Sequence, residues 1–122
     1  MSASISTLHG VRILQCAADG PRLESERDAV EVIGNALSAR ANLVIVPVSR
    51  LGDGFFSLKT RIAGEIIQKF VNYDLRLVIL GDIAGHAAAS DALRDFVNET
   101  NRGRQVWFLA DRSELESRLA RP

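Results

Sequence analysis

Apolar residues along the chain occur both as short continuous runs and in longer stretches where they recur every three or four positions. The continuous runs at 42–48 (NLVIVPV), 75–80 (LRLVIL) and 105–110 (QVWFLA) are typical of strands covered on both faces. Helical spacing over 25–40, 57–72, 91–100 and 114–120 predicts four helices. The segment 4–20 predicts two more strands joined by a turn at His9-Gly10.

The predicted helices and strands have defined ends. Ser25 with Asp28, and Ser113 with Glu116, are expected to cap the first and last helices, and Pro47 to end the third strand. The expected apolar stripe of the first helix comprises Ala29, Val30, Ile33, Ala36 and Leu37. That of the second comprises Leu58, Ile62, Ile66 and Phe70. A glycine within the second helix, Gly64, is expected to permit close packing on the sheet.

Strands alternating with helices indicate a single α/β domain over residues 1–122. The element order β-β-α-β-α-β-α-β-α predicts a mixed, mostly parallel sheet of about five strands with an N-terminal hairpin and four helices.

Composition narrows the classes of function. Basic and acidic residues number 15 each, so no nucleic-acid-binding surface is expected. One cysteine, Cys16, and two histidines exclude an intrachain disulfide and argue against a zinc site; no metal or cofactor is expected. No stretch has the pattern of a signal peptide or a membrane span, so a cytoplasmic protein without membrane partners is expected.

Ligands of open α/β sheets usually bind beyond the carboxyl ends of the strands. The candidates there are Asp53, Phe55, Phe56, Ser57, Lys59, Thr60, Asp82 and His86. One hypothesis places an anion at the start of the 57–72 helix, near Lys59, Thr60 and Arg61. The favoured alternative is a capped helix under a hydrophobic lid formed by Phe55 and Phe56.

Two further interpretations apply to Asp82. It could pair with His86, with Ser57 or Ser90 nearby, or it could end a strand with Gly81, which is favoured. The motifs GxxxxGK[ST], GxGxxG and GxSxG are not present.

At the opposite end of the sheet, the turn NRGR at 101–104 joins a helix to a strand. Gly103 fits the position after a helix, and Asn101 also tolerates left-handed backbone geometry. Arg102 and Arg104 either bind helix carbonyls or Glu99, or form a basic surface for a partner. Trp107 is expected in the core unless its strand lies at an edge.

The stretches FFSLKTRIAGEIIQKFVNYDLRLVILGD (55–82) and ETNRGRQVWFL (99–109) resemble a bacterial family known as domain of unknown function 4180. The likeness covers about residues 10–119 and implies no activity, substrate or cofactor. Members often carry an acidic residue where this chain has Ser57, which argues against an essential role for that serine. The element order is also similar to the STAS domain of anti-sigma-factor antagonists, whose phosphorylatable serine has a place comparable to Ser57, but the Asp-Ser-Ser-Gly-like signature is missing.

Two functions are expected from these patterns. The first is a non-enzymatic regulatory or interaction module that binds another protein, or a second copy of itself, through residues 55–61, the NRGRQ turn, or both. The alternative is a small enzyme or a small-molecule or anion binder, with a pocket lined by Asp53, Lys59, Thr60, Asp82 and His86.

Overall fold

The computed structural model describes residues 3–121, which form one five-stranded sheet in the order β1-β2-β3-β4-β5. Strands β1 (Ser4–Leu8) and β2 (Val11–Gln15) form the predicted antiparallel hairpin. Its two-residue turn places His9 and Gly10 at φ 50° and 79°, the geometry of a tight hairpin turn. Strands β3 (Leu43–Pro47), β4 (Arg76–Leu80) and β5 (Val106–Leu109) continue the sheet in parallel. The predicted α/β class and mostly parallel sheet are confirmed.

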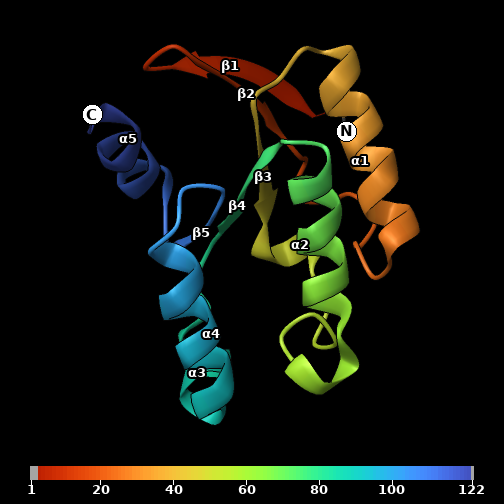
Figure 1. Cartoon of the computed structure of the whole chain (residues 1–122), viewed down its shortest axis with the longest axis vertical. Helices are drawn as coiled ribbons and strands as arrows, with labels where there is room; N and C mark the ends of the chain where they lie inside the picture. The colour runs from red at the N-terminus through yellow and green to blue at the C-terminus, as the bar shows by residue number, and fades with distance from the viewer. Residues whose placement is uncertain (1–2, 122) are drawn as a thin grey trace.

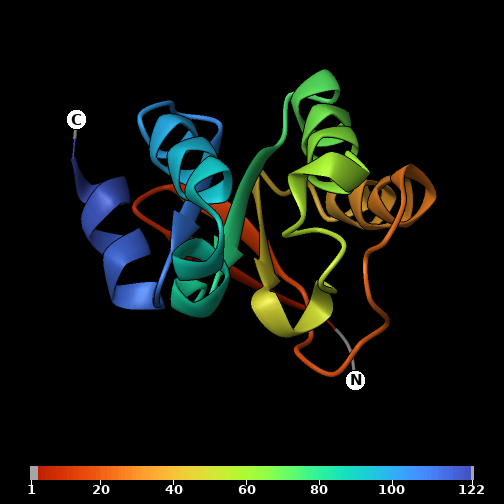
Figure 2. The same cartoon turned by 90° about the horizontal axis from the view of Figure 1, so that it is seen from below.

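Five helices accompany the sheet: α1 (Glu26–Ser38), α2 (Ile62–Asn72), α3 (Ala84–Ala89), α4 (Asp91–Asn101) and α5 (Arg112–Ala120). Neighbouring parallel strands follow one another in sequence, so crossovers of the same hand place their helices on one face. Figures 1 and 2 show α1, α2 and α4 together on that face and α5 on the other. Figure 2 looks onto the carboxyl ends of the parallel strands.

Two apolar layers enclose the sheet. The larger one packs α1, α2 and α4 against side chains of alternate strand positions, among them Val44, Leu77 and Phe108. The smaller one packs Leu115 of α5 against the positions between these, such as Ile45. Arg112 joins α5 to the hairpin, because its Nη1 donates to Gln15 Oε1 at 2.6 Å and its Nη2 to the Ser6 hydroxyl at 3.0 Å.

The apolar stripe predicted for α1 is partly wrong. Ala29, Ile33 and Ala36 are buried as expected, but Val30 and Leu37 are 42% and 49% exposed. These two positions are seven residues apart and therefore share a face that points away from the core. Val32 takes the buried position instead, which completes the set Ala29, Val32, Ile33 and Ala36. The predicted Ser25 cap is confirmed, since its hydroxyl accepts from Asp28 N.

Helix α2 begins at Ile62, five residues later than predicted. Residues 58–60 form a single 3₁₀ turn, and Arg61 has left-handed backbone geometry at φ 66°. The Thr60 hydroxyl causes this break, because it bonds back to the Gly54 carbonyl at 2.6 Å and accepts from Ile62 N at 3.2 Å. The interpretation of Gly64 is also wrong: a Cβ there would meet no atom within 4 Å, so this glycine serves no close approach to the sheet.

Two further elements differ from the sequence analysis. Residues 81–90, where no helix was predicted, contain the short helix α3, built on an alanine run that favours helix. The cap of α5 is Asp111 rather than Ser113: its carboxylate accepts from Glu114 N at 3.0 Å, and Glu114 Oε1 accepts from Ala110 N at 3.3 Å. The cap and its acidic partner therefore have the spacing of a capping box and begin two residues earlier than predicted, but Glu114 bonds to the residue before the cap.

Candidate functional site

The aromatic pair at the carboxyl ends of the strands is buried. Phe55 and Phe56 are 2% and 5% exposed, and their rings meet edge to face with centroids 5.1 Å apart. Phe56 also stacks on the His86 imidazole at 4.2 Å, with 15° between the ring planes. This packing agrees with the hydrophobic lid, the interpretation favoured for this segment.

The polar residues beside the lid have structural partners. Asp82 Oδ1 accepts from Ala84 N at 2.8 Å, at the start of α3, and the Ser90 hydroxyl caps α4 by accepting from Leu93 N at 3.1 Å. Within residues 3–121, no hydrogen bond or ion pair joins Asp82 to His86. The structure thus places these groups near one end of the sheet but does not assemble them into an acid–base relay.

The other sequence candidates at this end are distributed along the same loop. Asp53, Lys59 and Thr60 are exposed, and Ser57 precedes the 3₁₀ turn without capping it through its side chain. Helix α2 starts directly after these residues, with Arg61 as its N-cap and the Thr60 hydroxyl accepting from Ile62 N at 3.2 Å, so the anion hypothesis for this helix start stays a prediction. None of these residues lines either of the two concavities described below.

A wide groove lies at the opposite end, where the parallel strands begin. Its volume is about 850 Å³, and its walls come from the loops that precede β3, β4 and β5 together with α5. Five arginines line it, which is a third of the 15 basic residues of the chain: Arg76, Arg102, Arg104, Arg118 and Arg121. The acidic side chain in the lining is Asp74. We call this feature the arginine groove.

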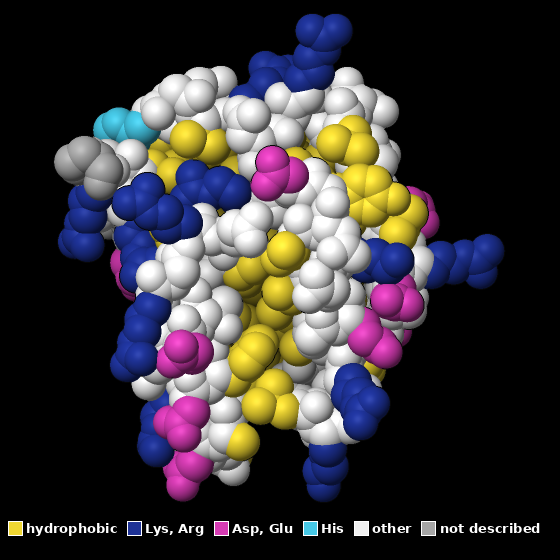
Figure 3. All heavy atoms as spheres, viewed as in Figure 1, with side chains coloured by type: hydrophobic (Ala, Val, Ile, Leu, Met, Phe, Trp, Pro, Cys, Tyr) yellow, Lys and Arg dark blue, Asp and Glu magenta, His cyan; other side chains and the backbone are white. Residues whose placement is uncertain are grey.

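Apolar surface is interleaved with the charge of the arginine groove. Tyr73 and Leu37, both in its lining, are 48% and 49% exposed. Figure 3 shows Lys and Arg side chains gathered next to apolar ones at this end of the molecule. Exposed aromatic and aliphatic side chains therefore lie beside arginines in this groove, a combination that is common at protein interfaces.

Trp107 forms the floor of the arginine groove. Although β5 is an edge strand, Trp107 is only 8% exposed, and its Nε1 donates to the Gly103 carbonyl at 2.8 Å. The guanidinium groups of Arg76 and Arg118 each lie 4.7 Å from the ring centroid. This indole therefore holds two cations in place through its π electrons.

Arg76 is crowded by positive charge. Its Nε donates to the Arg104 carbonyl at 3.0 Å. Burial lowers the pKa of Arg76 from its ordinary value, and the charge of Arg104 lowers it further. Both effects mean that the protonated guanidinium would gain from an anion in the groove.

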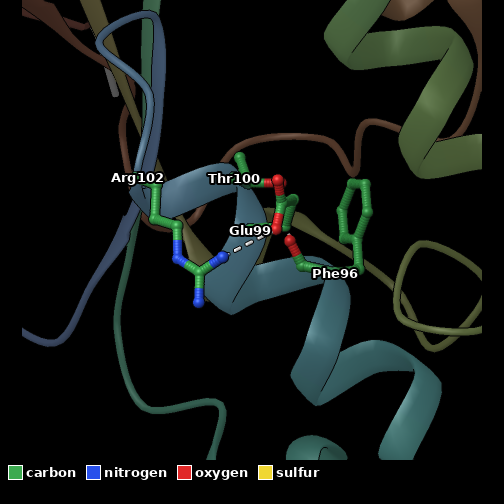
Figure 4. Close-up of polar contacts among 4 residues, drawn as sticks. All are labelled: Phe96, Glu99, Thr100 and Arg102. Carbon is green, nitrogen blue, oxygen red and sulfur yellow. Dashed lines mark hydrogen bonds and ion pairs between the residues drawn. The ribbon is translucent and has the colours of Figure 1, made fainter.

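Most arginines of the groove lack an acidic neighbour. Among the described residues, the ion pair in this groove is the one from Arg102 Nη1 to Glu99 Oε2 at 3.0 Å, shown in Figure 4. Both side chains of that pair are more than three-quarters exposed, so the pair contributes only about 0–1 kcal/mol and leaves Arg102 available. The remaining arginines have no carboxylate within 4 Å in residues 3–121.

Asn101 fixes the turn that carries Arg102 and Arg104. Its side-chain oxygen accepts from Phe108 N at 2.6 Å, and its side-chain nitrogen donates to the Phe108 carbonyl at 3.1 Å. Asn101 is the last residue of α4, so the amide side chain, and not the left-handed backbone suggested by the sequence, is what this position uses. Gly103 does follow the helix end, after the C-cap Arg102.

Arg102 and Arg104 were predicted from the sequence, but most of the groove was not. Arg76 begins β4, and Arg118 and Arg121 lie in or beside α5, so nothing in their local sequence shows that they meet. The available signal was the topology: loops before parallel strands lie at one end of the sheet, which brings Arg76 close to the 101–104 turn.

Within residues 3–121, no helix is long and apolar enough to cross a membrane, and no group of three or more His, Cys, Asp or Glu side chains could hold a metal ion.

Fold and site together define a small α/β domain with a mixed sheet, three crossover helices on one face and a basic groove at the amino ends of its strands. A family model described as a domain of unknown function, DUF4180, matches residues 8–119. The chain therefore belongs to this family, as its motifs suggested. No curated protein and no solved structure gives a significant match.

Proposed function

We propose that this protein is a non-enzymatic interaction module, STAS-like in architecture, that binds an acidic segment of another protein in its arginine groove. The observation that carries the proposal is a set of five arginines in one groove, most of them without an acidic partner among the described residues. Guanidinium groups bind carboxylates through paired hydrogen bonds, so aspartate or glutamate side chains would complete the site.

The surroundings of the arginines favour a polypeptide over other anions. The groove is open and about 850 Å³ in volume, whereas small metabolites are usually bound in enclosed pockets. Tyr73 and Leu37 offer contacts for apolar side chains between the acidic ones. A nucleic acid is disfavoured because the chain has no net positive charge to attract a polyanion over a distance.

Of the two segments expected to bind a partner, the NRGRQ turn is the better supported. Phe55 and Phe56 are buried in the core and cannot contact a partner directly. Arg102 and Arg104 are exposed on a turn that the side-chain hydrogen bonds of Asn101 hold in place. Pre-organised charged groups lose little conformational freedom on binding, which raises affinity.

Fluorescence anisotropy with labelled peptides tests this proposal. The probes are a peptide that alternates Asp or Glu with Leu and Tyr, its Asn/Gln counterpart, and a single-stranded oligonucleotide. Arg102→Glu and Arg104→Glu should each weaken binding of the acidic peptide at least tenfold, or by ~1.4 kcal/mol, and binding should weaken as salt is added.

Arg94→Glu is the matched control, since Arg94 is an exposed arginine of α4 with its own i,i+3 ion pair outside the groove. If Arg94→Glu and Arg104→Glu weakened binding of the acidic peptide equally, the peptide would be attracted nonspecifically to the charge of the protein. Preferential binding of the oligonucleotide, or sedimentation of the free protein as a stable dimer through this groove, would contradict the proposal.

A further inference from the structure

A second, smaller cavity lies at the carboxyl ends of β2 and β3. Its volume is about 230 Å³, and it opens between α1 and the loop that follows β2. Leu14, Cys16 and Val32 form its apolar part. At ~30 Å³ per water in the liquid, this volume holds about seven or eight waters, or a ligand of similar heavy-atom number. The position is the one where open α/β sheets usually bind ligands.

Arg50, in the lining of this cavity, is the buried charged residue of the described chain, at 9% exposure. No carboxylate of residues 3–121 lies within 4 Å of it. A buried cation without a counter-charge is costly, because the loss of hydration is not repaid by an opposite charge. An anion bound in the cavity would supply the missing counter-charge.

The guanidinium of Arg50 is held in one orientation. Its Nε donates to the Pro21 carbonyl and its Nη1 to the Ala17 carbonyl, the latter at 2.9 Å. Its plane lies against Gly20, where a Cβ would be only 2.6 Å from Nη1. Those two bonds engage Nε and Nη1. They leave Nη2, which is not fully buried, without a hydrogen bond from the described residues.

The charge of Arg50 acts within the cavity itself. Burial raises the pKa of the Cys16 thiol, and the positive charge of Arg50 partly offsets that effect. The cation is thus close enough to the cavity wall to influence a neighbouring group, as it would a bound carboxylate.

The mouth of the cavity also carries negative charge. Asp28 and Glu31 are three residues apart on α1, so they share one helix face with Val32 beside them. Asp28 is engaged by Glu24 N at 2.8 Å, and Glu31 is exposed at the mouth. Arg22 lines the cavity as well, so a ligand here would meet two arginines, two carboxylates and apolar side chains.

We propose that this cavity binds a small α-amino acid with a short apolar side chain. Its carboxylate would lie at Arg50, its ammonium at Glu31 and Asp28, and its side chain against Leu14 and Val32. This site is separate from the arginine groove and does not depend on the function proposed there.

Titration by two-dimensional ¹H–¹⁵N NMR tests the site, with L-valine, its 2-oxo acid and isobutylamine as probes. L-Valine should shift the amide signals of Ala17, Gly20 and Val32. The 2-oxo acid lacks the ammonium and should bind about tenfold more weakly, and isobutylamine lacks the carboxylate and should leave those signals unchanged. Glu31→Gln should weaken L-valine binding by about tenfold, which is ~1.4 kcal/mol.

Glu26→Gln, on the same helix but outside the cavity lining, is the control and should bind L-valine like the parent protein. Both substitutions lie on the surface of α1, so the comparison does not depend on a destabilising change at Arg50. Three results would overturn the proposal: no shift with L-valine at millimolar concentration, binding of isobutylamine alone, or equal binding of L-valine and its 2-oxo acid with no effect of Glu31→Gln.

Discussion

Replacing Asn101 with alanine removes both hydrogen bonds that close the outer edge of β5. Strand positions alternate, and the bonds to β4 use the carbonyls of Gln105 and Leu109, so the N–H and C=O of Phe108 point to the free edge. Asn101 satisfies both groups at 2.6 and 3.1 Å. In the variant they would depend on water or on another strand.

The expected loss follows from the number of bonds. Each net hydrogen bond contributes about 1 kcal/mol, so Asn101→Ala should lower the free energy of unfolding by ~2 kcal/mol. For a chain of this size that is a fall in Tm of roughly 6–10 °C. Asn101→Asp keeps the acceptor for Phe108 N but places a carboxylate oxygen against the Phe108 carbonyl. It should therefore not restore the free energy of unfolding of the parent protein.

Urea unfolding followed by circular dichroism measures this loss, and hydrogen exchange at the Phe108 amide localises it. Asn98→Ala is the matched control, because Asn98 is an exposed asparagine of the same helix. A difference between Asn101→Ala and Asn98→Ala of less than about 0.5 kcal/mol would refute the assigned role of Asn101. Unchanged exchange at Phe108 would refute it as well.

Three other predictions concern glycine and cysteine positions. Gly34→Ala and Gly64→Ala, at helix sites where a Cβ meets no atom within 4 Å, should each raise the free energy of unfolding by about 0.5–1 kcal/mol in urea titrations. Gly81→Ala should lower it by about 2 kcal/mol or more, since Gly81 has φ 143° and a Cβ there would lie 2.8 Å from Val48 Cγ2; a neutral result would contradict that geometry. Burial raises the pKa of the Cys16 thiol above 9.0, so its contribution to stability is complete below that pH and is lost as pH rises through the folded-state pKa. Unfolding of the parent and of Cys16→Ala, compared at about pH 8 and about pH 10, should show the steeper decline in the parent.

Features that depend on local periodicity were predictable from the sequence. Continuous apolar runs were sufficient to predict the buried strands at 42–48, 75–80 and 105–110. The hairpin could be predicted from two neighbouring strand-like segments joined by His9-Gly10. The Ser25 cap followed from the spacing to Asp28 in the same way. These features are determined by neighbours a few residues away.

Features that depend on specific side-chain hydrogen bonds or on tertiary packing were not predictable from periodicity. Helix spacing continues from 57 to 72, but the bonds of Thr60 to Gly54 and Ile62 break it. Spacing alone gave Val30 and Leu37 as core positions, whereas the tertiary packing of α1 selects Val32.

The candidate sites show the same limit. Arg102 and Arg104 were visible as a basic turn, but their association with Arg76 and Arg118 around Trp107 exists only in the folded chain. Arg50 resembled any other loop arginine until its burial beneath Gly20 was known.

The most direct test of the arginine groove uses Trp107, the one tryptophan of the chain, as an intrinsic reporter on the groove floor. Its fluorescence is followed while the acidic peptide is added to the parent protein and to Arg104→Glu. The account predicts a saturable change in the parent, no change with the Asn/Gln peptide, and a midpoint at least tenfold higher for Arg104→Glu. Peptide binding that leaves Trp107 fluorescence unchanged, or that is unaffected by Arg104→Glu, would contradict the account.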